Sequence, residues 1–379
     1  MQLVLNEDQR MLQDAARNFC RDHAPVDVLR ETRDSRDPTG YPAALWQQMV
    51  NLGWAGMAIP EEHDGFGFGY GGLGIVLEET GRTLVPSPLV ASVLLGATAV
   101  NLAGSEAQKK SILPQVVSGQ MTLALALEET PFHRPSHIAC RAQRDGEGFR
   151  ISGRKQFVLD GHCADQLIVV ARTTGESGDE SGITLFVVDG NAEGLKRMRT
   201  SMVDSRNAAI IELEDVRVDQ DAVLGDVDGG HAVLERVLDI GRIGLAAEML
   251  GGIQEVFDRT VAYLKERKQF GVPIGSFQAL QHRAAILYSE IELCRSLVRK
   301  ALAELDGEQR GIPVLASAAK AKLGEVFTLV SNEGVQMHGG IGMTDEFDIG
   351  FYLKRARVAG QCLGDTAFHR DRYARLNGY

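Results

Sequence analysis

The pattern of apolar residues along this 379-residue chain changes twice, from helical to strand-like and back to helical. This order constrains the fold more than any other feature. Apolar residues follow a helical period at Leu5–Phe19, and further helices are predicted over 43–52, 72–83, 89–103 and 106–117. From Thr122, short apolar runs alternate with Gly- and Asp-rich turns, which is typical of short strands. From Gly230, long helical patterns return over 232–264, 277–305 and 313–337. The order predicts a multidomain α+β protein: an N-terminal helical domain (1–121), an antiparallel β domain (122–226) and a C-terminal helical bundle (227–379).

Composition excludes several classes of function. The formal net charge is −11, and basic residues are interspersed with acidic ones, which argues against a nucleic-acid surface. The five cysteines form no CxxC pair, so reduced thiols of a cytoplasmic protein are expected. The N-terminus has no signal-peptide pattern, and the longest apolar stretch, near 89–103, is too short and polar to span a membrane. We therefore expect a soluble cytoplasmic protein that contacts neither nucleic acid nor membrane.

Two tempting motifs have simpler explanations. Gly69–Gly74 fits the dinucleotide fingerprint GxGxxG, but no strand is predicted before it, so a glycine-rich connector is favoured. His133 and His137 have HxxxH spacing, but Pro135 between them prevents the helix that would bring both to one metal. No metal site is predicted.

Two other segments carry a chemical signal. Glu266–Ile274, followed by Phe277 and Gln278, gathers a fixed cation (Arg267), an aromatic face (Phe270) and an amide around a Gly-Pro turn. These groups suit a pyrophosphate and a purine or ribose, whereas a plain helix end would explain only the turn. Gln336–Gly342 is either a helix stopped by glycine or backbone bared for close approach to a ligand.

Together these segments resemble the acyl-CoA dehydrogenase family. The pattern RxxFGxPIxxFQxxQ begins at Arg267, and QxxGGxG begins at Gln336. The likeness extends over nearly the whole chain, including the segments 5–19, 53–65, 104–119, 151–155 and 214–218. The resemblance implies an N-terminal helical domain, a central antiparallel β-barrel and a C-terminal four-helix bundle.

The resemblance also implies a cofactor, FAD, lying at a subunit interface. Its flavin ring would lie against the β domain of one subunit, and its adenosine diphosphate end would be held by the bundle of a neighbour. The matching residues for that grip are Arg267, Phe270, Phe277, Gln278, Gln336, Gly339 and Gly340. The implied chemistry is α,β-desaturation of an acyl-CoA in fatty acid or lipid catabolism, with a glutamate as base and an electron-transfer flavoprotein as acceptor.

The chain departs from the family where the base should be. The family's Glu-Gly-Thr segment corresponds to Leu363-Gly364-Asp365, and leucine cannot accept a proton. Asp365 lies two residues further on and has a shorter side chain. The base position that some members keep on the first helix of the bundle corresponds to Gly241, which leaves Glu248, further along that helix, as a remote candidate. No catalytic residue is assigned, and Asp365 and Glu248 are the fallback candidates.

The β domain departs as well. Two family hydroxyls beside the flavin ring correspond to Leu127 and Leu159, which cannot hydrogen-bond a flavin. The adenosine half of the family's site is thus kept, and the flavin-ring half is lost. The chain therefore resembles the small, non-catalytic subunit of bacterial heteromeric (α2β2) acyl-CoA dehydrogenases, which would contribute its grip to a catalytic partner. A self-sufficient homotetrameric dehydrogenase or related flavin enzyme with an unusual base, and a non-enzymatic acyl-CoA-binding or assembly protein, remain alternatives.

Overall fold

The computed structural model describes residues 4–379, which cluster into two compact units. Unit 1 contains the chain up to Arg30, Tyr70–Val85 and Arg242–Tyr379, and unit 2 contains Glu31–Gly69 and Pro86–Gly241. The helices before the sheet are α1 (Glu7–His23), α2 (Val26–Ser35), α3 (Ala43–Asn51), α4 (Gly69–Arg82), the π-helical η3 (Leu89–Ala97), α5 (Thr98–Ala103) and α6 (Glu106–Val117), with short 3-10 turns η1 (Trp54–Gly56) and η2 (Glu61–His63). The predicted N-terminal helices are therefore confirmed within a few residues.

Helix α1 begins where its capping residues predict. The Asn6 side chain accepts a hydrogen bond from the Gln9 backbone N–H at 2.8 Å, and the Gln9 side chain accepts one from the Asn6 N–H at 3.1 Å. This reciprocal pair satisfies two backbone donors that a helix start otherwise leaves open.

The glycine-rich run 69–74 is the start of α4 and not a phosphate loop. Its glycines allow close packing: a Cβ on Gly74 would lie 2.5 Å from the Leu302 side chain. Further along α4, a Cβ on Gly81 would lie 2.0 Å from the Glu248 carbonyl oxygen of α7. The sequence predicted a glycine-rich connector here, whereas the run forms the first turns of a helix, and no strand precedes it among the described residues.

The sheet in unit 2 contains β1 (Leu123–Ala126), β2 (Arg141–Asp145), β3 (Gly148–Leu159), β4 (Gln166–Arg172), β5 (Ile183–Asp189), β6 (Leu195–Ser201), β7 (Asn207–Val218) and β8 (Val223–Leu224), with the turn η4 (Gln220–Ala222) before β8. Its order is β6-β7-β3-β2-β4-β5-β8, and β1 pairs with β4. The pairs β1–β4 and β2–β4 are parallel, and the others are antiparallel.

The prediction of an antiparallel β-barrel is therefore wrong: among the described residues the sheet is mixed and does not close. The cause lies in the connections. Turn residues between neighbouring runs predict hairpins, such as β2–β3 and β4–β5, and these are antiparallel. The long connection 127–140 between β1 and β2 is no hairpin, and turn chemistry gives no strand direction there.

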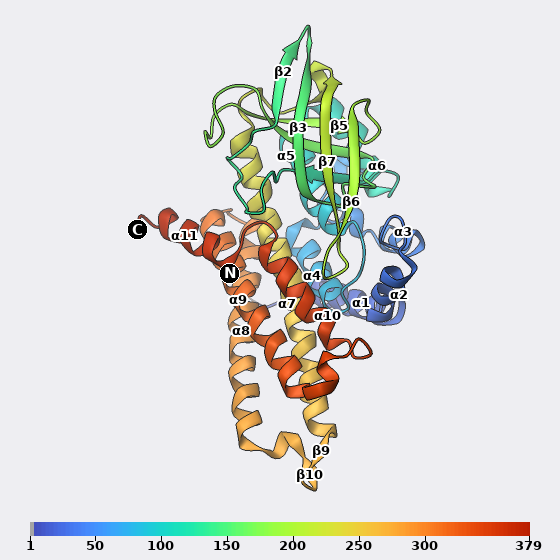
Figure 1. Cartoon of the computed structure of the whole chain (residues 1–379), viewed down its shortest axis with the longest axis vertical. Helices are drawn as coiled ribbons and strands as arrows, with labels where there is room; N and C mark the ends of the chain where they lie inside the picture. The colour runs from blue at the N-terminus through green and yellow to red at the C-terminus, as the bar shows by residue number, and fades with distance from the viewer. Residues whose placement is uncertain (1–3) are drawn as a thin grey trace. The chain divides into compact units, whose positions relative to one another are not determined.

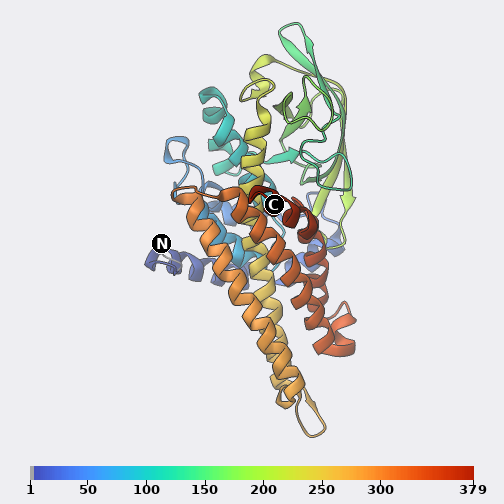
Figure 2. The ribbon, with the colours of Figure 1, turned by 90° about the vertical axis from the view of Figure 1, so that its left-hand side faces the viewer.

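The C-terminal helices are α7 (Gly230–Glu266), α8 (Gln278–Asp306), α9 (Ile312–His338), α10 (Ile349–Gln361) and α11 (Thr366–Leu376). A small hairpin, β9 (Lys268–Gln269) with β10 (Val272–Pro273), and the turn η5 (Ile274–Ser276) join α7 to α8, and η6 (Gly339–Met343) follows α9. The lower parts of α7, α8, α9 and α10 lie alongside one another, and α11 packs on α9 as an additional helix (Figures 1 and 2). The three predicted long helices are confirmed. No helix within residues 4–379 is long and apolar enough to cross a membrane.

Candidate functional site

The hairpin after α7 lies at one end of the bundle (Figure 1). The hairpin and the start of α8 carry an aromatic pair and a cation. A hydrogen bond from Ile274 N to Arg267 O at 2.8 Å closes the hairpin, and Phe270 at its tip is 93% exposed. The rings of Phe270 and Phe277 meet edge-to-face, with centroids 6.1 Å apart. No hydrogen bond or ion pair within the described chain holds the Arg267 guanidinium. Exposed aromatic faces and an unpaired guanidinium are groups that a ligand or a second chain would cover.

The second predicted segment lies at the same end of the bundle. Helix α9 ends at His338, whose ring stacks on Tyr263 with centroids 4.4 Å apart. Tyr263 is in the last turn of α7, four residues before Arg267. Gly339 has a φ of +66°, which a residue with a side chain rarely adopts, and a Cβ on Gly339 or Gly340 would meet nothing within 4 Å. The structure thus brings both predicted segments to one end of the bundle, with Gln278 and Gln336 also exposed.

The turn that carries Leu363 is fixed by buried donors. The Leu363 carbonyl accepts hydrogen bonds from Arg242 Nε at 3.3 Å and His369 Nε2 at 3.0 Å. Lys320 Nζ donates to the carbonyl of Ala359 at 2.7 Å, and burial lowers the pKa of this lysine to about 8. These donors were not foreseen, because no motif marks a buried cation whose partners are carbonyl oxygens.

Both fallback bases have partners within the described chain. Asp365 Oδ1 accepts a hydrogen bond from Phe368 N at 2.8 Å and so caps α11. Glu248 is buried on α7 and forms an ion pair with Arg355 at 3.0 Å. Asp365 also lines a cavity of about 300 Å³ beside Gly360 and Thr366, so space exists next to this turn.

In the β domain, polar groups around the position that corresponds to the flavin-ring site hydrogen-bond one another. Leu127 is only 3% exposed, and its carbonyl accepts a hydrogen bond from the buried Lys155 Nζ at 3.1 Å. The same amine bonds Glu129 Oε1 at 2.6 Å, and Glu128 bonds His133. No buried side-chain nitrogen or oxygen in the described segments 127–140 and 155–159 lacks a partner.

Near this cluster, Phe157 has a φ of +53° at a β-bulge, and 45% of its surface is exposed. Leu159 ends strand β3 and contributes only apolar surface. This part of the sheet therefore offers an aromatic face, and it has no buried, unpaired side-chain polar group that a cofactor could bond.

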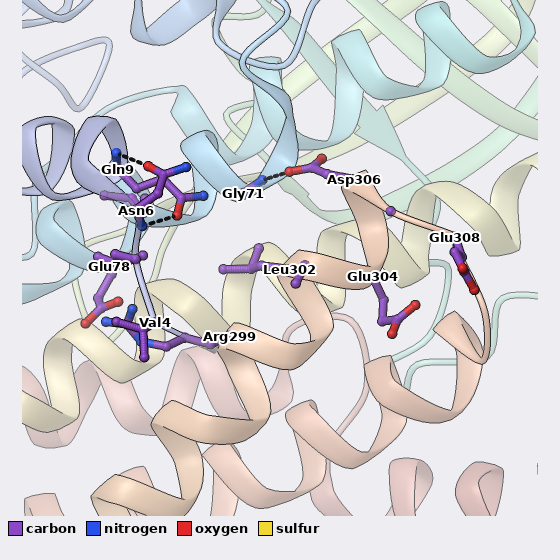
Figure 3. A pocket seen from close by; sticks show the side chains of 14 residues that line it. Val4, Asn6, Gln9, Gly71, Glu78, Arg299, Leu302, Glu304, Asp306 and Glu308 are labelled. Carbon is purple, nitrogen blue, oxygen red and sulfur yellow. Dashed lines mark hydrogen bonds between the residues drawn. The ribbon is translucent and has the colours of Figure 1, made fainter. Parts of the chain in front are cut away.

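A separate cavity of about 580 Å³ lies in unit 1 between the start of α1, α4 and the end of α8 (Figure 3). Asp306 on its wall accepts hydrogen bonds from the backbone N–H groups of Tyr70 and Gly71, at 2.7 and 2.6 Å. Glu78 pairs with Arg295 at 3.2 Å, and burial raises the pKa of Glu78. The acids have structural partners, and none of the predicted site residues lines this cavity.

Comparison with known proteins agrees with the order of the domains. Models of the acyl-CoA dehydrogenase N-terminal, middle and C-terminal domains match residues 6–120, 134–216 and 228–376. The chain belongs to the acyl-CoA dehydrogenase family. Members are FAD-dependent oxidoreductases, so the predicted enzyme class and cofactor are confirmed.

Three acyl-CoA dehydrogenase relatives cover nearly the whole chain. It is 32% identical to Probable acyl-CoA dehydrogenase YngJ of Bacillus subtilis and 28% identical to the Caffeyl-CoA reductase-Etf complex subunit CarC of Acetobacterium woodii, in each case over 94% of both chains. A structure of a variant of the Tcur3481-Tcur3483 steroid ACAD is 33% identical, covers 98% of both chains and has a TM-score of 0.88.

The two halves of the acyl-CoA dehydrogenase site differ in how they fit FAD. The bundle end fits the adenosine diphosphate group, because it offers an unpaired guanidinium, exposed aromatic rings and open glycine backbone. In the described segments 127–140 and 155–159, every buried side-chain nitrogen and oxygen already has a partner, so no buried side-chain donor is left for the flavin ring.

Proposed function

We propose that this chain is a supporting subunit of a heteromeric acyl-CoA dehydrogenase and holds the adenosine diphosphate end of FAD for a homologous catalytic subunit. The observation that carries the proposal is the contrast between the exposed, open bundle end and the described segment 127–140, whose buried side-chain nitrogen and oxygen atoms all have partners. When bound, FAD supplies the two-electron oxidation of the acyl group to the α,β-unsaturated thioester.

The chain's own residues would bind the adenosine diphosphate end of FAD and fix its orientation. Arg267 would donate to the pyrophosphate, since a guanidinium suits phosphate oxygens. Phe270 and Phe277 would pack on the purine, and Gln278 and Gln336 would hydrogen-bond the ribose or ring edge. Gly339 and Gly340 would let the backbone come close to the ligand. Leu363 would take no part in proton removal.

Two relatives support an assembly with other chains. CarC is named as a subunit of a complex with Etf, and the steroid ACAD carries two joined designations. By analogy we propose an α2β2 assembly that passes its electrons to an electron-transfer flavoprotein, in the cytoplasm and within lipid catabolism. The boundaries 1–121, 122–226 and 227–379 are proposed as its domain limits.

One observation favours the competing function, a self-sufficient homotetramer with an unusual base: Asp365 lines a cavity next to the Leu363 turn. Flavin content separates the two. We would express the chain alone and together with a homologous chain that has the family's glutamate, and measure FAD per chain by absorbance and acyl-CoA-dependent dye reduction. Little flavin alone and about one FAD per chain pair after co-expression support the proposal. Full occupancy with activity in the chain alone would overturn it.

A further inference from the structure

His338 joins the two segments of the proposed adenosine diphosphate grip. Its ring is 3% exposed and lies between Tyr263 at the end of α7, with centroids 4.4 Å apart, and Phe347, with centroids 4.9 Å apart. The next residue along the chain is Gly339. The stack therefore connects the Arg267 hairpin to the open glycine backbone.

The hydrogen bonding of His338 fixes the position of one ring proton. Nδ1 lies 2.7 Å from the Gly334 carbonyl oxygen, and a carbonyl can only accept, so Nδ1 carries the proton. Nε2 is buried and has no hydrogen-bond partner among residues 4–379, so no acceptor there would hold a second proton.

The surroundings oppose a second proton on the ring. Burial lowers the pKa of His338, and the nearby Arg259 cation lowers it further. Both carboxylates beside Arg259 are already paired: Glu255 with Arg259 at 2.8 Å, and Asp348 with Arg259 and Arg30, each at 2.9 Å.

We infer that His338 is a positioning residue. Its neutral ring, stacked on Tyr263, holds Gly339 and Gly340 beside the Arg267 hairpin, and a proton on Nε2 disrupts this stacking. The inference rests on the proposed function. An imidazolium would place a second N–H donor in an apolar aromatic slot beside a cation, which favours expulsion of the ring. Acidification should therefore weaken binding of an adenosine diphosphate group without any change in Arg267 itself.

The test is calorimetric titration of ADP into the full-length chain from about pH 8 to about pH 5.5. For wild type, affinity should fall by up to about tenfold per pH unit below the pKa of His338, beyond the loss caused by protonation of ADP itself. H338F keeps the aromatic stack and cannot titrate, so only the ADP part of the pH dependence should remain. H338A should bind weakly at every pH, and H282F, which removes an exposed histidine of α8, should behave as wild type.

The same pH dependence in H338F and wild type would overturn the inference and leave the proposed function standing. Absence of ADP binding by wild type at every pH would count against the proposed function. Hydrogen exchange then decides the inference separately: amides of residues 338–343 should lose protection on acidification in wild type and keep it in H338F. Unchanged protection in wild type would overturn it.

Discussion

Arg355 on α10 donates a hydrogen bond from Nη1 to Oε1 of Glu248 on α7 at 3.0 Å, and both side chains are buried. An acid held in this way ties two helices of the bundle together. The ion pair gives Glu248, one of the two candidate bases, a structural role.

Loss of Glu248 should therefore destabilise the protein. Glu248→Ala leaves a buried guanidinium without its partner, which costs about 3–5 kcal/mol. We expect a lower midpoint in urea, and the double change Glu248→Met with Arg355→Met should restore much of the loss. A Glu248→Ala protein of unchanged stability that has lost dehydrogenase activity would instead identify Glu248 as the base.

Substitutions at Asp365 can separate its structural role, as a helix cap, from a catalytic role as a base. Because it caps α11, Asp365→Ala should cost about 1 kcal/mol in the free energy of unfolding, whereas Asp365→Asn should be nearly neutral. Asparagine keeps the capping oxygen but cannot accept a catalytic proton. Acyl-CoA oxidation assays of the reconstituted assembly should show no loss with either variant, and selective loss in Asp365→Asn would revive the homotetramer hypothesis.

Asp160 should make unit 2 sensitive to pH. Burial raises its pKa from 3.8 to about 6, and Asn207 Nδ2 donates to its Oδ1 at 3.0 Å. The folded state thus binds the proton more tightly than the unfolded state. The stabilisation is complete below the unfolded pKa and is lost as the pH rises through about 6.

The expected change in the free energy of unfolding is up to about 3 kcal/mol. Asp160→Asn keeps the acceptor oxygen and should remove this pH dependence, so that the variant is more stable than wild type above pH 6. Thermal unfolding measured across the acidic and neutral range checks this. Parallel pH curves for the two proteins would contradict it.

Arg267 should affect flavin and leave stability unchanged. Its side chain is exposed and unpaired in the described chain, so Arg267→Met removes no folded-state contact. We expect the co-expressed assembly to lose most of its FAD while its melting temperature stays within the error of wild type. Arg310→Met, at another exposed arginine, serves as the control. Equal flavin content in both variants would argue against the grip.

The sequence predicted the helices well because their signals are local. Asn6 and Gln9 mark the start of α1 through contacts three residues apart, and the long apolar periods of α7, α8 and α9 follow helical geometry. Strand direction depends on pairings such as β1 with β4, more than 40 residues apart, and local turn chemistry does not encode them.

The candidate site also contains residues that local motifs predict and residues that they do not. The motifs around Arg267 and Gln336 identified two segments, and the structure places them at one end of the bundle. Lys320, Arg242 and His369 were missed because each binds backbone carbonyl oxygens, which carry no sequence signature. Whether the segments bind FAD stays a prediction.

The cap on α4 has a consequence for the order in which the chain matures on the ribosome. Two backbone N–H groups in the first turn of this helix, at Tyr70 and Gly71, are satisfied by Asp306, which is translated 235 residues after Gly71. Unit 1 as a whole combines the chain up to Arg30 and Tyr70–Val85 with Arg242–Tyr379. In a nascent chain that ends before Asp306, the early helices of unit 1 therefore lack their partners. A chaperone that shields apolar helices would be needed most during that interval.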